Sequence, residues 1–151
     1  MALVLVGGAG WSTVAVAAGV LCALGMGRAG AAEKVPCLAF DPTTVTIQGF
    51  LHSRHAFGPP GYGEDPKHDS VEHIYVIVLD APICVNGDPK SDINSDSVSG
   101  VREIQVWADR QGLWQRMKSV RGKKVIARGT LETAVTAHQR TPVTLKIRSI
   151  Q

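Results

Sequence analysis

A chain of 151 residues has room for one domain, and its length excludes a second domain of ordinary size. Its formal net charge is only +3, but the charge is unevenly distributed. Residues 33–100 carry ten acidic and four basic side chains, whereas residues 101–151 carry three acidic and eleven basic ones. The basic half could face an anionic partner, or the two halves could interleave in space and cancel.

The first 32 residues have the character of a signal peptide. No charged residue precedes Arg28, the stretch from Val14 to Leu24 is apolar, and Ala29-Gly-Ala31 fits a small-x-small cleavage site. The sequence therefore predicts a protein of the periplasm or a secreted protein, with residues 33–151 as its domain. An uncleaved membrane anchor is the alternative, since 26 uncharged residues are enough to span a bilayer.

Two cysteines, Cys37 and Cys84, remain beyond the predicted signal peptide. An even pair in a chain bound for an oxidising compartment favours a disulfide bond. A catalytic thiol or a metal ligand is the alternative, but no Cys-x-x-Cys spacing supports it.

The first half of the domain predicts two strands separated by loops. Residues 44–51 alternate apolar with polar side chains, and Gly49 stands on the inward register, where a missing side chain permits a sharp bend. Residues 58–66 are dense in Gly and Pro and predict a loop. Residues 71–79 are apolar on both registers and predict a strand covered on both faces, which Pro82 ends. The polar residues 86–100 predict a long exposed loop.

The second half predicts three strands and one helix. Residues 101–107 form a third strand, and a helix follows with Leu113, Met117 and Val120 on one stripe. Asp109 is the expected helix cap and Gly122 the stop. Residues 123–131 and 143–148 form the fourth and fifth strands.

These elements predict a mainly β domain. Five strands with a helix between the third and the fourth is the element order of the OB-fold, a five-stranded, partly open Greek-key barrel. Cys37 precedes the first strand and Cys84 follows the second, and antiparallel neighbours bring those two ends together. The order of elements and the cysteine positions therefore agree, and the disulfide would stabilise the domain by roughly 2–4 kcal/mol.

Several short segments carry a family resemblance. They are Gly58-Pro-Pro-Gly-Tyr62, Leu79-Asp80, Pro82-Ile-Cys84-Val85, Ile104-Gln105, Gly122 with Val125, Gly129-Thr-Leu131, and His138 before Thr141-Pro-Val143. In this order, from about Cys37 to Ile150, they resemble a bacterial family of exported small domains described as domain of unknown function 4431. The resemblance implies an exported OB-like barrel and no activity. His138-Gln-Arg stands where a His-rich turn is expected, which argues against a metal role for that turn.

Two loops form the expected ligand-binding site. The loop between the first two strands, residues 57–69, contains rigid Pro59 and Pro60 together with Tyr62 and Asp65. OB barrels commonly bind ligands there, and the loop between the last two strands, with His138 and Arg140, lies opposite in that topology. The alternative is that the Pro-Pro-Gly-Tyr segment only packs the barrel mouth.

Other chemistries have weaker signals. His68-Asp69 with His73 could suggest a metal site, and Asp88, Asp92 and Asp96 a calcium loop, but neither has the spacing of a known site. The expectation is no metal and no cofactor.

The basic run from Arg116 to Arg128 lacks the interleaved aromatics of a nucleic-acid surface, so nucleic acid is not expected as a partner. Because no nucleophile elbow, phosphate loop or His-Glu-x-x-His occurs, no catalytic residues and no enzyme are expected. We expect an envelope binding module for a peptide, a glycan or a protein. The alternative is a structural or inhibitor-like interaction subunit.

Overall fold

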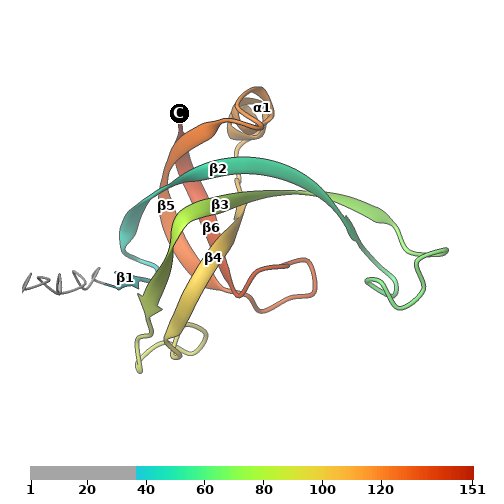
Figure 1. The fold of residues 1–151 in the computed structure, drawn as a ribbon. Coiled ribbons are helices and arrows are strands. Elements are labelled where there is room, and N and C mark those ends of the chain that lie inside the picture. Colours follow the sequence, from blue (N-terminus) through green and yellow to red (C-terminus); the bar gives the residue numbers. More distant parts are fainter. Residues whose placement is uncertain (1–36) are drawn as a thin grey trace, which may run out of the picture. The chain divides into compact units, whose positions relative to one another are not determined.

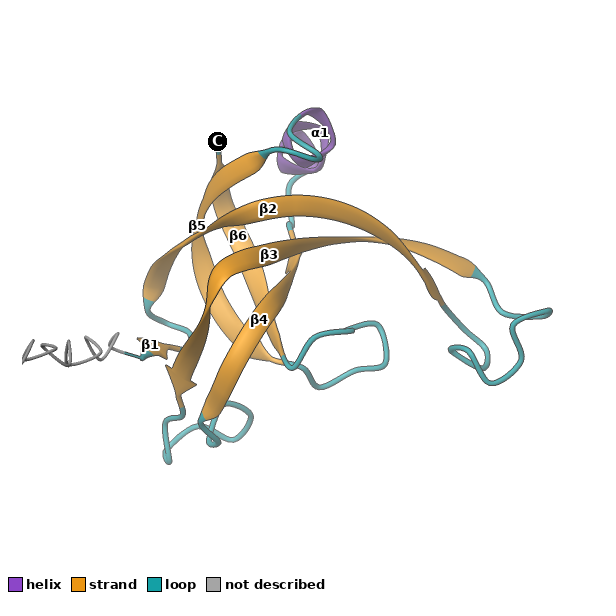
Figure 2. Ribbon diagram, in the orientation of Figure 1, coloured by secondary structure: helices purple, strands orange, loops and turns teal. Residues whose placement is uncertain are grey.

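The computed structural model describes residues 37–151 (Figures 1 and 2), so the predicted signal peptide, residues 1–32, lies outside the described residues. The described part is mainly β with one helix. Its elements are β1 (Leu38–Ala39), β2 (Thr44–Phe57), β3 (Val71–Asn86), β4 (Val98–Trp107), α1 (Gln111–Ser119), β5 (Lys124–Thr133) and β6 (Val143–Ile150). The prediction of a mainly β domain with a helix after the third long strand is confirmed. Within residues 37–151, no helix has the length and apolarity needed to cross a bilayer.

The strands form one six-stranded sheet in the order β1-β3-β2-β5-β6-β4, with an additional β3–β4 pairing. The predicted count of five strands is therefore wrong, because the two-residue β1 adds a parallel partner to β3. Among the five long strands, β2 pairs with β3 and β5, β3 with β4, β4 with β6, and β6 with β5. The five long strands are therefore hydrogen-bonded in a closed ring, in the order β2-β3-β4-β6-β5 and back to β2.

The core is formed by buried apolar side chains of all five long strands together with Met117 of helix α1. Val45, Ile47 and Leu51 of β2 are buried, while the side chains on the alternate register are exposed. Met117 is the fully buried residue of α1. Gly49 lies in the same inward series, and a Cβ there would collide with the backbone oxygen of Val78. The sequence predicted that Gly49 permits a bend. In the structure, the backbones of β2 and β3 pass so closely at Gly49 that a side chain would have no space.

Two strands run further than predicted. β2 continues from Leu51 to Phe57, and β3 continues through Pro82 to Asn86. Pro82 is tolerated because it falls inside the register shift between Val78 and Ile83, where regular pairing with β4 is interrupted. Cys84 consequently lies within β3 and not after it.

The predicted disulfide is confirmed: Cys37 and Cys84 are bonded, with their Cα atoms 4.6 Å apart. The parallel pairing of Leu38 with Val85 places the two cysteines side by side. The bond therefore joins the start of the described chain to the C-terminal end of β3.

Helix α1 begins without the predicted cap. Its N-cap residue is Arg110, which makes no side-chain capping bond. Asp109 instead forms an ion pair with Lys146 on β6, at 3.4 Å. The predicted stop is correct, since Gly122 follows the helix with a φ of 76°, a conformation that favours glycine.

The segment between β3 and β4 is mostly exposed, as predicted, apart from one buried residue. Asn94 is only 4% exposed, and its side-chain oxygen accepts a 2.9 Å hydrogen bond from the backbone of Thr133. Its backbone oxygen accepts from Asp88 at 2.8 Å. A single buried amide thus anchors a loop whose composition is otherwise that of a solvated segment.

Candidate functional site

Strands β2 and β3 extend beyond the rest of the sheet (Figure 1). Pairing of β2 with β5 ends at Phe50, and pairing of β3 with β4 begins at Tyr75. Among the described residues, residues 52–57 of β2 therefore pair with β3 alone, and residues 71–74 of β3 pair with β2 alone, as a two-stranded ribbon. We call this ribbon, with the loop 58–70 at its tip, the arm.

The loop at the tip of the arm is ordered by one carboxylate. Asp69 accepts hydrogen bonds from the backbone nitrogens of Gly61 and Gly63, both at 2.6 Å. Gly58 and Ser70 close the base of the loop through a backbone hydrogen bond of 2.7 Å. Between the two bonded glycines, Tyr62 takes a left-handed conformation with a φ of 52°. The loop thus holds Tyr62 in one orientation.

The loop between β5 and β6, residues 134–142, is fastened to β4 by Gln105. The Gln105 side chain accepts from the backbone of Arg140 at 2.6 Å and donates to the backbone oxygen of His138 at 3.0 Å. Its backbone nitrogen donates to Thr141 Oγ1 at 2.8 Å. Because Gln105 is 9% exposed, these bonds form away from competing water.

Side chains from the two loops meet at the arm. Tyr62 Oη lies 3.1 Å from His138 Nε2, and Glu72 Oε1 accepts from His138 Nδ1 at 2.6 Å. Arg140 donates to the backbone oxygen of Phe57, and its guanidinium lies 3.7 Å from Glu72 and 5.4 Å from the centre of the Tyr62 ring. We call Tyr62, Glu72, His138 and Arg140 the loop cluster.

The contacts within the loop cluster fix the orientation of its side chains. With Glu72 accepting from Nδ1, a neutral His138 has Nε2 free to accept from the Tyr62 hydroxyl. Arg140 places a cation over the tyrosine ring, a contact worth about 0.5–1 kcal/mol at an exposed site. The cluster can therefore present an aromatic ring and a guanidinium in a fixed relative position.

The predicted site residues are brought together in part. Tyr62, His138 and Arg140 are in contact, although Tyr62 and His138 are 76 positions apart in the sequence. Pro59 and Pro60 are exposed on the same loop as Tyr62. Asp65 instead pairs with His68, 2.6 Å away within its own loop.

Glu72 and Gln105 were missed from the sequence. Neither residue stood out, because other polar residues lie beside it in the same strand, His73 next to Glu72 and Glu103 two positions before Gln105.

An ion pair fastens the base of the arm. Both terminal nitrogens of Arg54 on β2 donate to the carboxylate of Glu103 on β4, at 2.7 Å each. Their register partners on the intervening β3 are Ile74 and Val78. Between these lies Val76, whose side chain is 1% exposed although it does not belong to the core cluster. The hydrogen bonds from Arg54 hold the pKa of Glu103 below its usual range and raise the pKa of Arg54.

The metal sites considered from the sequence do not assemble. Asp69 binds backbone nitrogens and His68 binds Asp65, so neither is directed toward His73. Across residues 37–151, no group of three or more His, Cys, Asp or Glu side chains could hold an ion.

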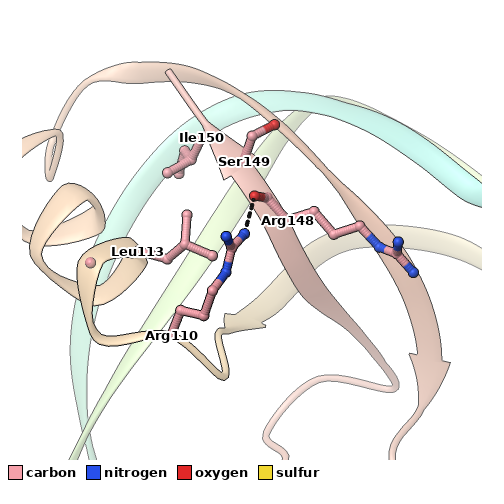
Figure 3. Close-up of a pocket in the computed structure, with 6 residues that line it drawn as sticks. Arg110, Leu113, Arg148, Ser149 and Ile150 are labelled. Atoms are coloured by element: carbon pink, nitrogen blue, oxygen red, sulfur yellow. Dashed lines mark hydrogen bonds between the residues drawn. The ribbon is translucent and has the colours of Figure 1, made fainter.

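A separate hollow is lined by Arg110, Gly112, Leu113, Arg148, Ser149 and Ile150 (Figure 3). Arg110 donates to the backbone oxygen of Arg148 at 2.9 Å, and the Arg148 side chain points away from Arg110 (Figure 3). The two guanidiniums therefore do not converge on one anion.

The part of the chain from Glu103 onward carries Gln105, helix α1 and the loop 134–142. Residues 103–151 match the model of a family described as Domain of unknown function (DUF4431). The resemblance to this family expected from short sequence segments is thereby confirmed over residues 103–151, whereas the expected segments before Glu103 lie outside the match. The DUF4431 match includes His138 and Arg140, while Tyr62 and Glu72 lie outside it. A comparison with curated proteins gives no match.

Proposed function

We propose that the chain is an exported bacterial binding module built on an OB-type barrel. Two observations support this proposal. The Cys37–Cys84 bond is of a kind that persists in oxidising compartments such as the periplasm or the cell exterior. The cyclic pairing of β2, β3, β4, β6 and β5, with a helix between β4 and β5, is the strand arrangement that a small Greek-key barrel requires.

The binding site is formed by the loop cluster and the exposed Pro59 and Pro60. The observation that carries this assignment is the contact of Tyr62 with His138, because it joins two loops that are distant in sequence at one end of the sheet. A packing role needs only apolar contact, whereas here Arg140 and Glu72 are also directed to the same point.

We infer binding and not catalysis. The His138 ring is held between Glu72 and Tyr62, and these contacts fix the tyrosine ring beside Arg140, as a recognition surface requires. A tyrosine ring next to prolines and a guanidinium suits an extended peptide or a glycan, or the corresponding surface of a protein partner. No cofactor is invoked.

A binding screen tests the site. Soluble cell-wall glycan fragments and an extended-peptide library are titrated against the wild type, Tyr62→Ala and Arg140→Ala, with Arg148→Ala as the matched control. Ligands of this site lose at least tenfold in affinity with either site variant and keep it with the control. Pull-downs from envelope extracts that are identical for the wild type and for the double variant would contradict the proposal.

The alternative is an interaction subunit that acts through a strand edge. The arm favours it, because residues 52–57 and 71–74 have no third strand beside them in the described structure. Unpaired backbone groups at such an edge can accept a strand from a partner. Light scattering that shows only monomers, together with crosslinking that finds no partner at the arm, would exclude this alternative.

A further inference from the structure

Two histidines face each other across the arm. His55 of β2 and His73 of β3 are directly paired in register, although 17 residues separate them in the sequence. Their ring centres are 4.3 Å apart, with the ring planes inclined by 61°. Both residues are exposed.

These two rings differ from the other histidines of the chain. His68 is bonded to Asp65, and His138 is bonded to Glu72 and Tyr62. His52 lies three positions before His55 on the same strand, so its side chain points to the opposite face. Within residues 37–151, no hydrogen bond occupies the ring nitrogens of His55 or His73, and both rings are therefore available as ligands.

We propose that His55 and His73 together bind a divalent late transition-metal ion, Cu²⁺ or Zn²⁺. Imidazole nitrogens suit these ions and bind them at about 2.0–2.1 Å. Side chains directly opposite on one face of an antiparallel pair have Cβ atoms about 4.5–5.5 Å apart, which lets both rings reach one ion. Water or a donor from a bound partner fills the other coordination positions.

The surroundings favour this class of ion over Ca²⁺ or Mg²⁺. The next pair on the same face is Phe57 with Val71, and both side chains are exposed. Together with His55 and Ala56, these two residues line a shallow hollow. The hollow thus supplies apolar walls beside the imidazole of His55, and the paired His73 adds a second imidazole, whereas Ca²⁺ and Mg²⁺ require several oxygen ligands.

The site is independent of the proposed function. Glu72 neighbours His73 in the chain, and successive side chains of a strand point to opposite faces. The histidine pair and the loop cluster therefore lie on opposite faces of the arm. The failure of one proposal leaves the other standing.

Metal titration of the full chain tests the proposal. Cu²⁺ and Zn²⁺ are titrated by calorimetry into the wild type, His55→Gln and His73→Gln, with His52→Gln and His68→Gln as matched controls. We expect one ion per chain at the pair, a loss of at least tenfold in affinity with either pair variant, and unchanged affinity with the controls. Equal affinity in the wild type and in the double variant His55→Gln/His73→Gln overturns the proposal.

A spectroscopic measurement keeps the test specific. The electron paramagnetic resonance spectrum of bound Cu²⁺ reports the number of coordinated nitrogens. We expect two imidazole nitrogens in the wild type and fewer in each pair variant, with circular dichroism unchanged because both residues are exposed. A spectrum that is the same in the wild type and in the pair variants assigns the ion to another site and overturns the proposal.

Discussion

Strands β2 and β3 run through both the sheet body and the arm, yet the two regions are stabilised differently. In the body, Val45, Ile47 and Leu51 of β2 face the core and are buried. In the arm, the same face of β2 continues as Ser53, His55 and Phe57, which are exposed or half-buried. The strand continues after the core has ended. There, the ion pair between Arg54 and Glu103 and the loop cluster replace apolar packing. Stability therefore resides mainly in the body, and chemically distinctive side chains lie on the arm.

The largest difference in stability between the sheet body and the arm is expected from two truncations on one face of β2. Leu51→Ala removes a fully buried side chain and should lower the free energy of unfolding by about 2–5 kcal/mol. Phe57→Ala, six residues further along, removes a ring that is 43% exposed and should cost about 1 kcal/mol or less. Urea unfolding measures both. Equal losses would mean that the arm packs as core.

Removal of the disulfide should destabilise the body and spare the arm. The bond joins residues 47 apart in sequence, and the variant Cys37→Ser/Cys84→Ser should lose about 2–4 kcal/mol of stability. A reducing agent should lower the melting temperature of the wild type to that of the variant and leave the variant unchanged. Metal affinity at His55 and His73 should not change, and a loss there would show that the two regions are coupled.

The smallest effect is expected at the base of the arm. Because the pKa of Glu103 is lowered in the folded state, its carboxylate stabilises the fold above the ordinary pKa of about 4.3, and this contribution is lost as the pH falls. The pair is largely exposed, so Glu103→Gln should cost about 0.2–1 kcal/mol at pH 7 and nearly nothing at pH 3. Unfolding curves at the two pH values measure the difference.

Glu132 on β5 serves as a control, because its pKa is shifted in the opposite direction to that of Glu103. Burial raises the pKa of its carboxyl group, so ionisation opposes folding at neutral pH. Glu132→Gln should therefore be neutral or stabilising at pH 7, with an effect that disappears in acid. If Glu103→Gln and Glu132→Gln gave the same pH dependence, the ion pair at the base of the arm would not explain it.

The sequence predicted the parts of the fold that depend on burial. Residues 44–51 and 143–148 alternate because one face is packed, and both segments lie in strands. The arm half of β2 was missed because Leu51-His-Ser-Arg-His contains no apolar alternation, so its strand conformation depends on pairing with β3. The end of β3 was missed because a proline normally ends pairing, and the irregularity that tolerates Pro82 has no local signal.

For the candidate site, the order of elements predicted which loops lie near one another. It did not predict which side chains are in contact. That order placed Tyr62, His138 and Arg140 near one another, and their contacts agree. Glu72 could not be assigned as their partner, because contacts between distant segments leave no local pattern. His55 and His73 were also not recognisable as a pair, since their meeting depends on which residue of β2 faces which residue of β3.

The close passage of Gly49 by Val78 limits how the arm can change in length. Nine consecutive pairs run without interruption from Gly49–Leu79 to Phe57–Val71, so the glycine contact in the body also determines which side chains meet at the far end. A residue inserted into one strand alone would turn every later side chain to the other face. One residue added to each strand would lengthen the arm and keep the partners matched. The length of the arm can therefore change only by equal insertions or deletions in β2 and β3. The register at Gly49, a residue without a side chain, determines which side chains meet in the arm.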